Sequence, residues 1–273
     1  MKKYIIILIL LAVGTLQAQR KPKIKGNKSV IEVGEDLPAF NAIELNDDLE
    51  VFVQKASSEG YSLTADDNLV DVLKFRVVDS TLVISSFYTI TSKRKLDITI
   101  NYVEINSLIL RDGRMRMKDI IDTDALEVTT FGSSKLELNA NASTMNIVMD
   151  GNSSGDFNLE SDELNMTLKD GINVRIYAVA DRLAMNMQDN ASAKMDGTSN
   201  ELQANLSGGA SLKAEKLQAD EVSANLEGSS SAKIYANKLL ELSSKGSSKT
   251  YLSGDGKIEI IDFLDTSELH KEK

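Results

Sequence analysis

The sequence predicts an all-β fold, a right-handed parallel β-helix (solenoid) built from repeated rungs of about 19 residues each. First, each unit of a repeat opens with an apolar residue: Leu126, Met145, Leu164, Leu183, Leu202, Val222 and Leu240. The spacings between successive openers are 19, 19, 19, 19, 20 and 18 residues. Second, a turn-forming residue follows each opener after six positions: Gly132, Gly151, Asp170, Asp189, Gly208, Gly228 and Gly246. A period of roughly 20 residues with turns at a fixed phase is typical of a solenoid, whose units bury their core faces against one another.

Within each rung, apolar and polar residues alternate with a period of two, as in residues 202–206 (LQANL). This alternation predicts strands that turn one face to the core and the other to solvent. A second apolar pair after each turn, such as Leu212 and Ala214, predicts another strand of the same rung. Equivalent strands of successive rungs must run parallel, and parallel crossovers are overwhelmingly right-handed.

The first residues have the pattern of a secretory signal peptide, which we expect at residues 1–18. Lys2 and Lys3 precede an apolar run, and residues 16–18 (LQA) form a suitable cleavage site. The run is shorter than the roughly 20 residues that a membrane-spanning helix needs. No second hydrophobic segment follows, so we expect no transmembrane segment after cleavage. The absence of cysteine excludes a lipid-modified cysteine, a disulfide framework and a cysteine metal site.

The mature chain divides into three parts. Residues 19–36 contain basic residues and little apolar material, which predicts a flexible basic leader. Residues 37–261 are expected to form a single β-helical domain, with a strand-rich cap at 37–109 and the repeated rungs at 110–261, because the end of a solenoid must cover its open edge. Residues 262–273 are charged and predict a C-terminal tail or short helix.

The charge balance argues against nucleic acid as a partner. Without Lys2 and Lys3, 29 basic residues face 41 acidic ones, a net charge of −12. Binding to nucleic acid depends on lysine and arginine side chains that neutralise phosphates. We therefore expect no nucleic-acid partner.

Four short segments precede the repeated Gly-Ser turns, which end at 251–254 (YLSG): residues 40–43 (FNAI), 49–53 (LEVFV), 96–100 (LDITI) and 108–110 (LIL). Together, these segments and turns resemble the family described as putative auto-transporter adhesin, head GIN domain. The resemblance covers about residues 40–254. The turns of the family usually read Ser-Gly-Ser-Gly, whereas Asp170-Gly171 and Asp189-Asn190 depart from that pattern. The resemblance implies a short-rung β-helix of the Gram-negative envelope without an established enzymatic activity.

No catalytic, cofactor-binding or metal-ligating set is evident from the sequence. The sole histidine, His270, lies in the expected tail, away from any nucleophile. The acidic pairs Asp47-Asp48 and Asp66-Asp67 fall where turns are expected, and neighbouring residues of a strand point to opposite faces. We therefore interpret both pairs as turn residues.

One outward column is a candidate ligand-binding site, and we call it the basic column: Arg175, Lys194, Lys213 and Lys233. Tyr177 and Tyr235 follow its first and last members after two residues. Stacked like charges repel each other, so such a column is costly unless something neutralises it. One interpretation of the basic column is a binding stripe for an acidic glycan or envelope polymer. In the alternative interpretation, which we favour from the sequence, Asp196 and Glu215 neutralise the column locally and it is ordinary solvated surface.

The leading functional hypothesis is a non-catalytic envelope β-helix, an adhesin or a binding and scaffolding module in the periplasm or at the surface of a Gram-negative bacterium. Its partner would be an envelope polymer, a glycan or a protein, with no cofactor, and its oligomeric state is open. The alternative is a polysaccharide lyase or hydrolase that uses carboxylates. A cleft with clustered acids on one face would favour the enzyme, and a flat, charge-balanced face would favour binding.

Overall fold

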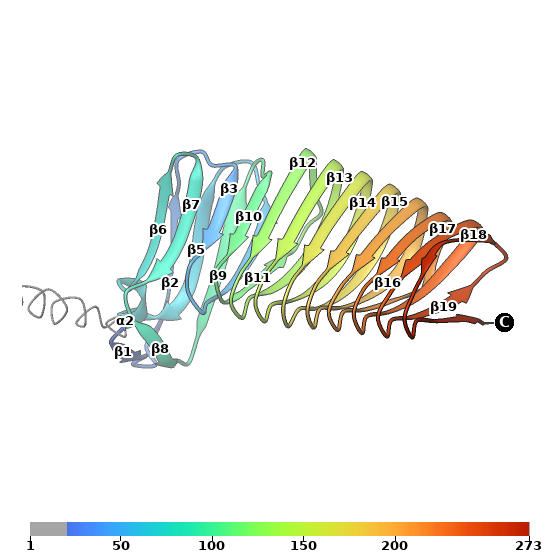
Figure 1. Cartoon of the computed structure of the whole chain (residues 1–273). Coiled ribbons are helices and arrows are strands. Elements are labelled where there is room, and N and C mark those ends of the chain that lie inside the picture. Colours follow the sequence, from blue (N-terminus) through green and yellow to red (C-terminus); the bar gives the residue numbers. More distant parts are fainter. Residues whose placement is uncertain (1–20, 273) are drawn as a thin grey trace, which may run out of the picture.

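The repeat forms one continuous ladder, in which each strand pairs in parallel with its equivalent in the next rung (Figure 1). The computed structural model describes residues 21–272, so the signal peptide expected at residues 1–18 lies outside the described part. The strands make a β-solenoid of about nine turns, which confirms the predicted fold class. Its central strands are β12 (Ile121–Thr130), β13 (Lys135–Met149), β14 (Ser154–Leu168), β15 (Asn173–Met187), β16 (Ser192–Leu206), β17 (Ser211–Leu226) and β18 (Ser231–Ser244).

The core consists of inward columns, and their members are the ones that the alternation predicts. Leu202, Ala204 and Leu206 are buried, and each pairs in register with a buried residue of the next rung. Small residues such as Ala210 and Ser230 are fully buried beside the turns, where the interior is narrow. Apolar burial of this kind contributes about 25 cal/mol per Å², and here each rung buries its inward residues against the rungs on either side.

All seven predicted turn residues adopt a positive φ, between +58° and +86°. Glycine accepts this conformation without steric cost, and aspartate tolerates it better than most residues. At Gly208 the stack adds a second constraint, because a Cβ there would lie 3.0 Å from Cα of Asp189 in the preceding rung. The turn column therefore selects glycine for its φ and for the close approach of successive turns.

The parallel ladder begins earlier than residue 110, where the repeat becomes recognisable. The short strands of these first rungs are β3 (Ala42–Leu45), β4 (Glu50–Lys55), β7 (Thr81–Ser86), β9 (Leu96–Tyr102), β10 (Ser107–Leu110) and β11 (Arg114–Met117). Strand β3 lies between β7 and β10, and β4 lies between β9 and β11, all in parallel pairing. Part of the predicted cap thus already has the geometry of the rungs.

The N-terminal end is closed by antiparallel strands and a short helix. Strand β5 (Gly60–Asp66) pairs with β9, and β6 (Leu73–Val78) pairs with β7. Between them, helix α2 (Asp67–Val70) places Leu69 in the core, where it is fully buried. This arrangement covers the apolar interior at the end of the stack, as a solenoid cap must do.

The segment expected to be a flexible leader is folded, which corrects that prediction for residues 21–36. Strand β1 (Lys23–Lys25) pairs with β8 (Thr89–Ser92), and β2 (Val30–Asp36) pairs with β5. The buried carboxylate of Asp66 accepts hydrogen bonds from the backbone N–H groups of Lys28 (3.2 Å), Arg94 (3.1 Å) and Lys95 (3.2 Å). A segment with few apolar side chains is therefore ordered through its backbone.

The C-terminal segment is also more regular than the predicted tail or helix. After β19 (Lys249–Ser253), strand β20 (Lys257–Phe263) pairs with β18, and β21 (Glu268–Lys271) pairs with β19. Residues 262–272 thus continue the last rung. No further strand of the described chain covers β20, and Ile260, Ile261 and Leu264 are more than half exposed.

We predict that Leu206→Asp lowers the free energy of unfolding by about 4 kcal/mol or more, because Leu206 is only 2% exposed and the substitution places a charge in an apolar column. Gln203→Lys, three residues earlier on the outward face of β16, should change stability by less than about 0.5 kcal/mol. Chemical unfolding measures both values. Equal stability of the two variants would contradict the assigned columns.

We also predict that Asp66 fastens the N-terminal segment in a pH-dependent way. Burial alone would raise the pKa of Asp66, but the N–H donors of Arg94, Lys28 and Lys95 and the charge of Arg94 outweigh it, so the pKa lies below its usual value. The carboxylate therefore stabilises the fold above the unfolded pKa of about 3.9, and this contribution is lost as the pH falls through the folded pKa.

Hydrogen-exchange mass spectrometry of residues 21–28 tests this fastening. Asp66→Asn should accelerate their exchange at pH 7, and the wild-type protein should show the same loosening only under strongly acidic conditions. Asp71→Asn, at an exposed acid just beyond α2, serves as the matched control and should leave exchange unchanged. Unaltered protection in the Asp66 variant would show that the carboxylate does not hold this segment.

Candidate ligand-binding faces

The outward residues form columns across the rungs, because the strands pair in register about 4.8 Å apart. In the basic column, Arg175 pairs with Lys194, Lys194 with Lys213, and Lys213 with Lys233. The first three side chains are exposed and the fourth is half-buried. The structure therefore brings the four predicted cations into one line along the solenoid.

Arg175 is the paired member of this column. Its Nε donates to Oδ1 of Asp156 at 2.6 Å, and this hydrogen bond and the charge of Asp156 raise the pKa of Arg175. Within residues 21–272, Lys194, Lys213 and Lys233 form no ion pair. The Nζ of Lys233 lies 5.6 Å from the ring centroid of Tyr251, a cation–π arrangement. Three stacked ammonium groups are thus left without a direct carboxylate partner in the described chain.

The expected neutralisation by Asp196 and Glu215 does not occur through ion pairs. The rung that opens at Leu202 has one extra residue, and a bulge after Lys213 shifts the register so that Asp196 pairs with Lys216. Neither carboxylate lies within ion-pairing distance of a lysine of residues 21–272. One oxygen of each, Oδ1 of Asp196 and Oε2 of Glu215, is buried without a hydrogen-bond partner in the described chain. The bulge therefore changes the partner of Asp196 in β17, and neither acid forms an ion pair with the basic column within the described chain, although Asp196 remains close to Lys194 on β16.

A groove of about 610 Å³ runs beside the N-terminal half of the basic column. Arg175, Tyr177 and Lys194 line it together, and the ring of Tyr177 is 53% exposed. Tyr235 is half-buried and lies beyond the bulge, in register with Gln218. The structure thus groups one of the two predicted tyrosines with the cations and places the other at a separate position.

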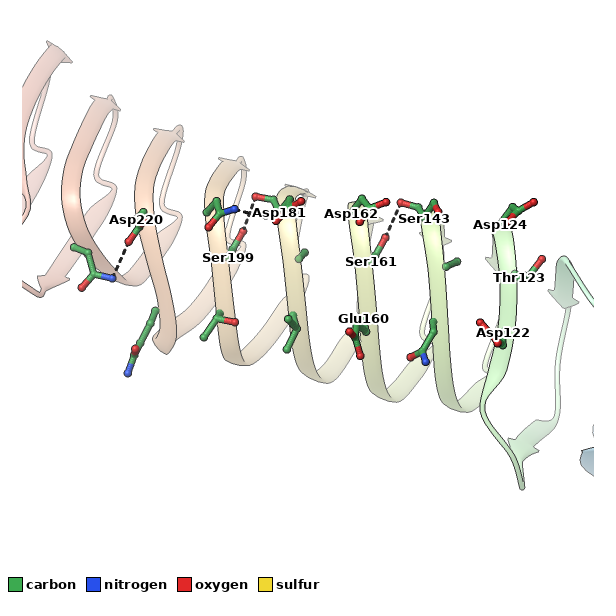
Figure 2. A pocket seen from close by; sticks show the side chains of 18 residues that line it. Asp122, Thr123, Asp124, Ser143, Glu160, Ser161, Asp162, Asp181, Ser199 and Asp220 are labelled. Carbon is green, nitrogen blue, oxygen red and sulfur yellow. Dashed lines mark hydrogen bonds between the residues drawn. The ribbon is translucent and has the colours of Figure 1, made fainter.

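A second, larger groove of about 880 Å³ follows the polar corners of the rungs, and its concave shape was not predicted from the sequence. Figure 2 shows its side chains projecting from successive rungs. We call it the acidic groove after the carboxylates that line it: Asp122, Asp124, Glu160, Asp162, Asp181 and Asp220. Four of them stand two residues before a rung opener, a phase that a column analysis of the corners would have detected.

Hydrogen bonds within and between the rungs hold the acidic groove in shape. The hydroxyl of Ser161 donates to the carbonyl of Glu163 at 2.8 Å, and the hydroxyl of Ser199 donates to that of Glu201 at 2.7 Å. The Nδ2 of Asn200 donates to Oδ1 of Asp181 at 2.9 Å. These bonds engage the hydroxyl groups of the two serines and fix the orientation of the Asp181 carboxylate.

At the C-terminal end of the acidic groove, Asp220 is paired with Lys238. Its Oδ2 lies 2.8 Å from Nζ of Lys238, and its Oδ1 accepts from Nδ2 of Asn237 at 3.2 Å. These two hydrogen bonds lower the pKa of Asp220. A carboxyl group that stays ionised in this way suits anchoring of a cation better than donation of a proton.

The other candidates from the sequence, an acidic pair and the histidine, take part in contacts that stabilise the fold. Asp47 accepts from the backbone N–H of Ser86 at 2.7 Å, as expected for a residue that fixes a turn. His270 lies on β21, where it stacks on Tyr251 at 4.9 Å and contacts Glu268 at 2.8 Å. Among residues 21–272, no group of three or more His, Cys, Asp or Glu has the arrangement of a metal site. No helix in the same part of the chain combines the length and apolar character that crossing a bilayer requires.

The family and the solved structures that resemble the chain agree with this architecture. A family model described as putative auto-transporter adhesin, head GIN domain, matches residues 39–158 and 150–256, and the chain therefore belongs to this family. A putative adhesin from Parabacteroides merdae ATCC 43184 has a TM-score of 0.69 at 14% identity, covering 92% of this chain and 100% of its own.

Two proteins from Parabacteroides distasonis ATCC 8503 also share the fold. A putative adhesin has a TM-score of 0.66 at 14% identity, covering 91% of this chain and 99% of its own. A putative lipid binding protein has a TM-score of 0.61 at 19% identity, covering 92% and 100%. No curated protein matches the chain. At these identities the similarity shows the solenoid fold alone.

Proposed function

We propose that this protein is a non-catalytic binding module of the cell envelope that holds an extended anionic polymer along its basic column. The observation that carries the proposal is the line of Lys194, Lys213 and Lys233, which are in register and without ion pairs in the described chain. Like charges about 4.8 Å apart repel each other, and a bound polyanion would relieve that repulsion. Membership of an adhesin family supports a role in binding.

The shape of this surface favours a linear ligand over a compact one. The cations repeat at the rung spacing, so a polymer with one anionic group about every 5 Å would meet one side chain per rung. Beside them, the exposed Tyr177 offers an aromatic face with a polar tip, which suits a sugar ring. An acidic glycan of the envelope combines both properties.

The site of action that fits this proposal is the periplasm or the cell surface of a Gram-negative bacterium. The expected signal peptide at residues 1–18 supports export, and the description of the family supports a role at the surface. The chain has no cysteine, so its stability does not depend on disulfide formation after export. The proposed module needs no cofactor.

The proposal predicts that binding to polygalacturonate weakens at least tenfold when the whole basic column is replaced by Gln, that is, Arg175, Lys194, Lys213 and Lys233 together. Binding of the wild-type protein should weaken with salt, because exposed charges are screened. Uncharged dextran is the control ligand, and a charge-matched variant with Lys118, Lys169, Lys245 and Lys257 replaced by Gln is the control protein. Equal binding by all three proteins, measured by titration calorimetry, would refute the proposal.

A carboxylate enzyme is the second candidate, and the acidic groove is the observation that favours it. Asp162 and Asp181 lie at equivalent positions of adjacent rungs, so a polysaccharide that follows the groove would meet both. Glycoside hydrolysis needs one protonated and one ionised carboxyl group placed on either side of the bond. Carboxylates that stand side by side in a column do not bracket a substrate in this way.

A screen of the purified protein on acidic and neutral polysaccharides separates the two candidates. We expect no release of oligosaccharide. If release occurs and the Asp162→Asn, Asp181→Asn double variant loses it, the protein is an enzyme and the non-catalytic assignment is wrong. The Asp47→Asn variant, outside the groove, is the matched control for this loss.

A further inference from the structure

The N-terminal end of the solenoid concentrates positive charge on a chain whose net charge is −10. Residues 21–28 and 87–95 contain lysine and arginine but no aspartate or glutamate. Their cations are all exposed, and together we call them the basic corner: Lys21, Lys23, Lys25, Lys28, Lys93, Arg94 and Lys95. These two segments are therefore positive on a chain that is negative as a whole.

Backbone pairing brings the two segments together, although they are far apart in the sequence. Lys23 and Lys25 of β1 pair with Thr89 and Ser92 of β8. The N–H of Gly26 donates to the carbonyl of Ser92 at 2.8 Å. The buried Asp66 binds the backbone of both segments, and any side chain at Gly26 would collide with that carboxylate. The basic corner is thus a fixed surface and not the meeting of two loose tails.

Most of this charge is uncompensated. Lys21 pairs with Asp47, and Lys95 pairs with Asp97. The other five cations form no ion pair with any of residues 21–272. Of the nearby carboxylates, Asp66 is buried and bound to backbone N–H groups, and Asp67 accepts a hydrogen bond from Nδ2 of Asn27. The corner therefore attracts an external anion.

Two exposed aromatic side chains adjoin the cations. Phe87 is 51% exposed and Tyr88 36%, and both stand directly before β8. The N–H of Thr89 donates to the carbonyl of Pro22 at 2.9 Å, which places the aromatic pair beside the start of β1. The Nζ of Lys74 lies 3.5 Å above the ring of Phe87. Aromatic rings surrounded by cations are the combination that binds the headgroup region of a membrane.

We propose that the basic corner seats the N-terminal end of the solenoid on an anionic lipid surface, with its cations on the phosphate groups and Phe87 and Tyr88 in the interfacial layer. Strands β1 and β8 lie at the end opposite the C-terminus (Figure 1). A flat surface meets this end alone, and charges of the acidic body more than about 8 Å away are screened. The inference does not depend on the proposed function of the rungs.

Vesicle sedimentation tests the charge. The exported protein should bind vesicles of phosphatidylglycerol and phosphatidylcholine, bind pure phosphatidylcholine much more weakly, and dissociate with salt. Replacing Lys23, Lys25, Lys93 and Arg94 together by Gln should weaken binding at least tenfold, because each cation near an anionic surface contributes about fivefold. Failure of the wild-type protein to bind, or equal binding by this variant, would overturn the proposal.

The charge-matched control separates this surface from a general effect of net charge. The variant with Lys118, Lys169, Lys245 and Lys257 replaced by Gln loses the same four charges outside the corner. It should bind the vesicles as the wild-type protein does. An equal loss in both quadruple variants would show that net charge alone governs binding, and would refute a localised site.

A fluorescent reporter tests the aromatic contact and the class of partner. The chain has no tryptophan, so Phe87→Trp supplies a single indole. Its emission should shift to shorter wavelength with the anionic vesicles, whereas Phe131→Trp, at an exposed turn of the rungs, should show no shift. Binding of a DNA duplex as tightly as of vesicles, without a shift for the Phe87 variant, would overturn the lipid assignment in favour of nucleic acid.

Discussion

The in-register pairing of each rung with the next is the interaction on which the rest of the molecule depends. It stacks every inward residue on its equivalent, so that Leu183 and Leu202 bury each other and neither could bury its side chain in an isolated rung. The same register aligns the turns and the outward residues. Core, turns and surface columns are therefore consequences of one pairing pattern, and a defect in one rung is felt first by its two neighbours.

This dependence explains why the centre of the fold can be predicted from the sequence and the ends cannot. A repeated column gives many observations of one environment, so the positive φ at Asp189 and Gly208 follows from the shared phase of their rungs. The strands at residues 21–36 have no repeat to reveal them. Their order depends on distant pairing and on the carboxylate of Asp66, a contact that residue composition does not encode.

The candidate sites likewise combine features that could be predicted from the sequence with features that could not. The position of the basic column could be predicted, because it needs only the register. The lack of an ion pair at Glu215 could not be predicted, since the extra residue of that rung forms a bulge whose position the longer spacing does not specify. The acidic groove depends on how the strands bend at the corners, and a pattern of alternating residues contains no information about curvature.

The two ends of the solenoid are built in different ways, so they should respond differently to a pulling force. Helix α2 and antiparallel strands close the N-terminal end, whereas the last layer, with Ile260 and Ile261, is bonded on one side only within the described chain. The hydrogen bonds between rungs run along the long axis, so tension along that axis acts on every interface between layers. The last layer of the described chain, which is bonded on one side only, would resist such tension least, while a ligand that spans several rungs would share the load among them.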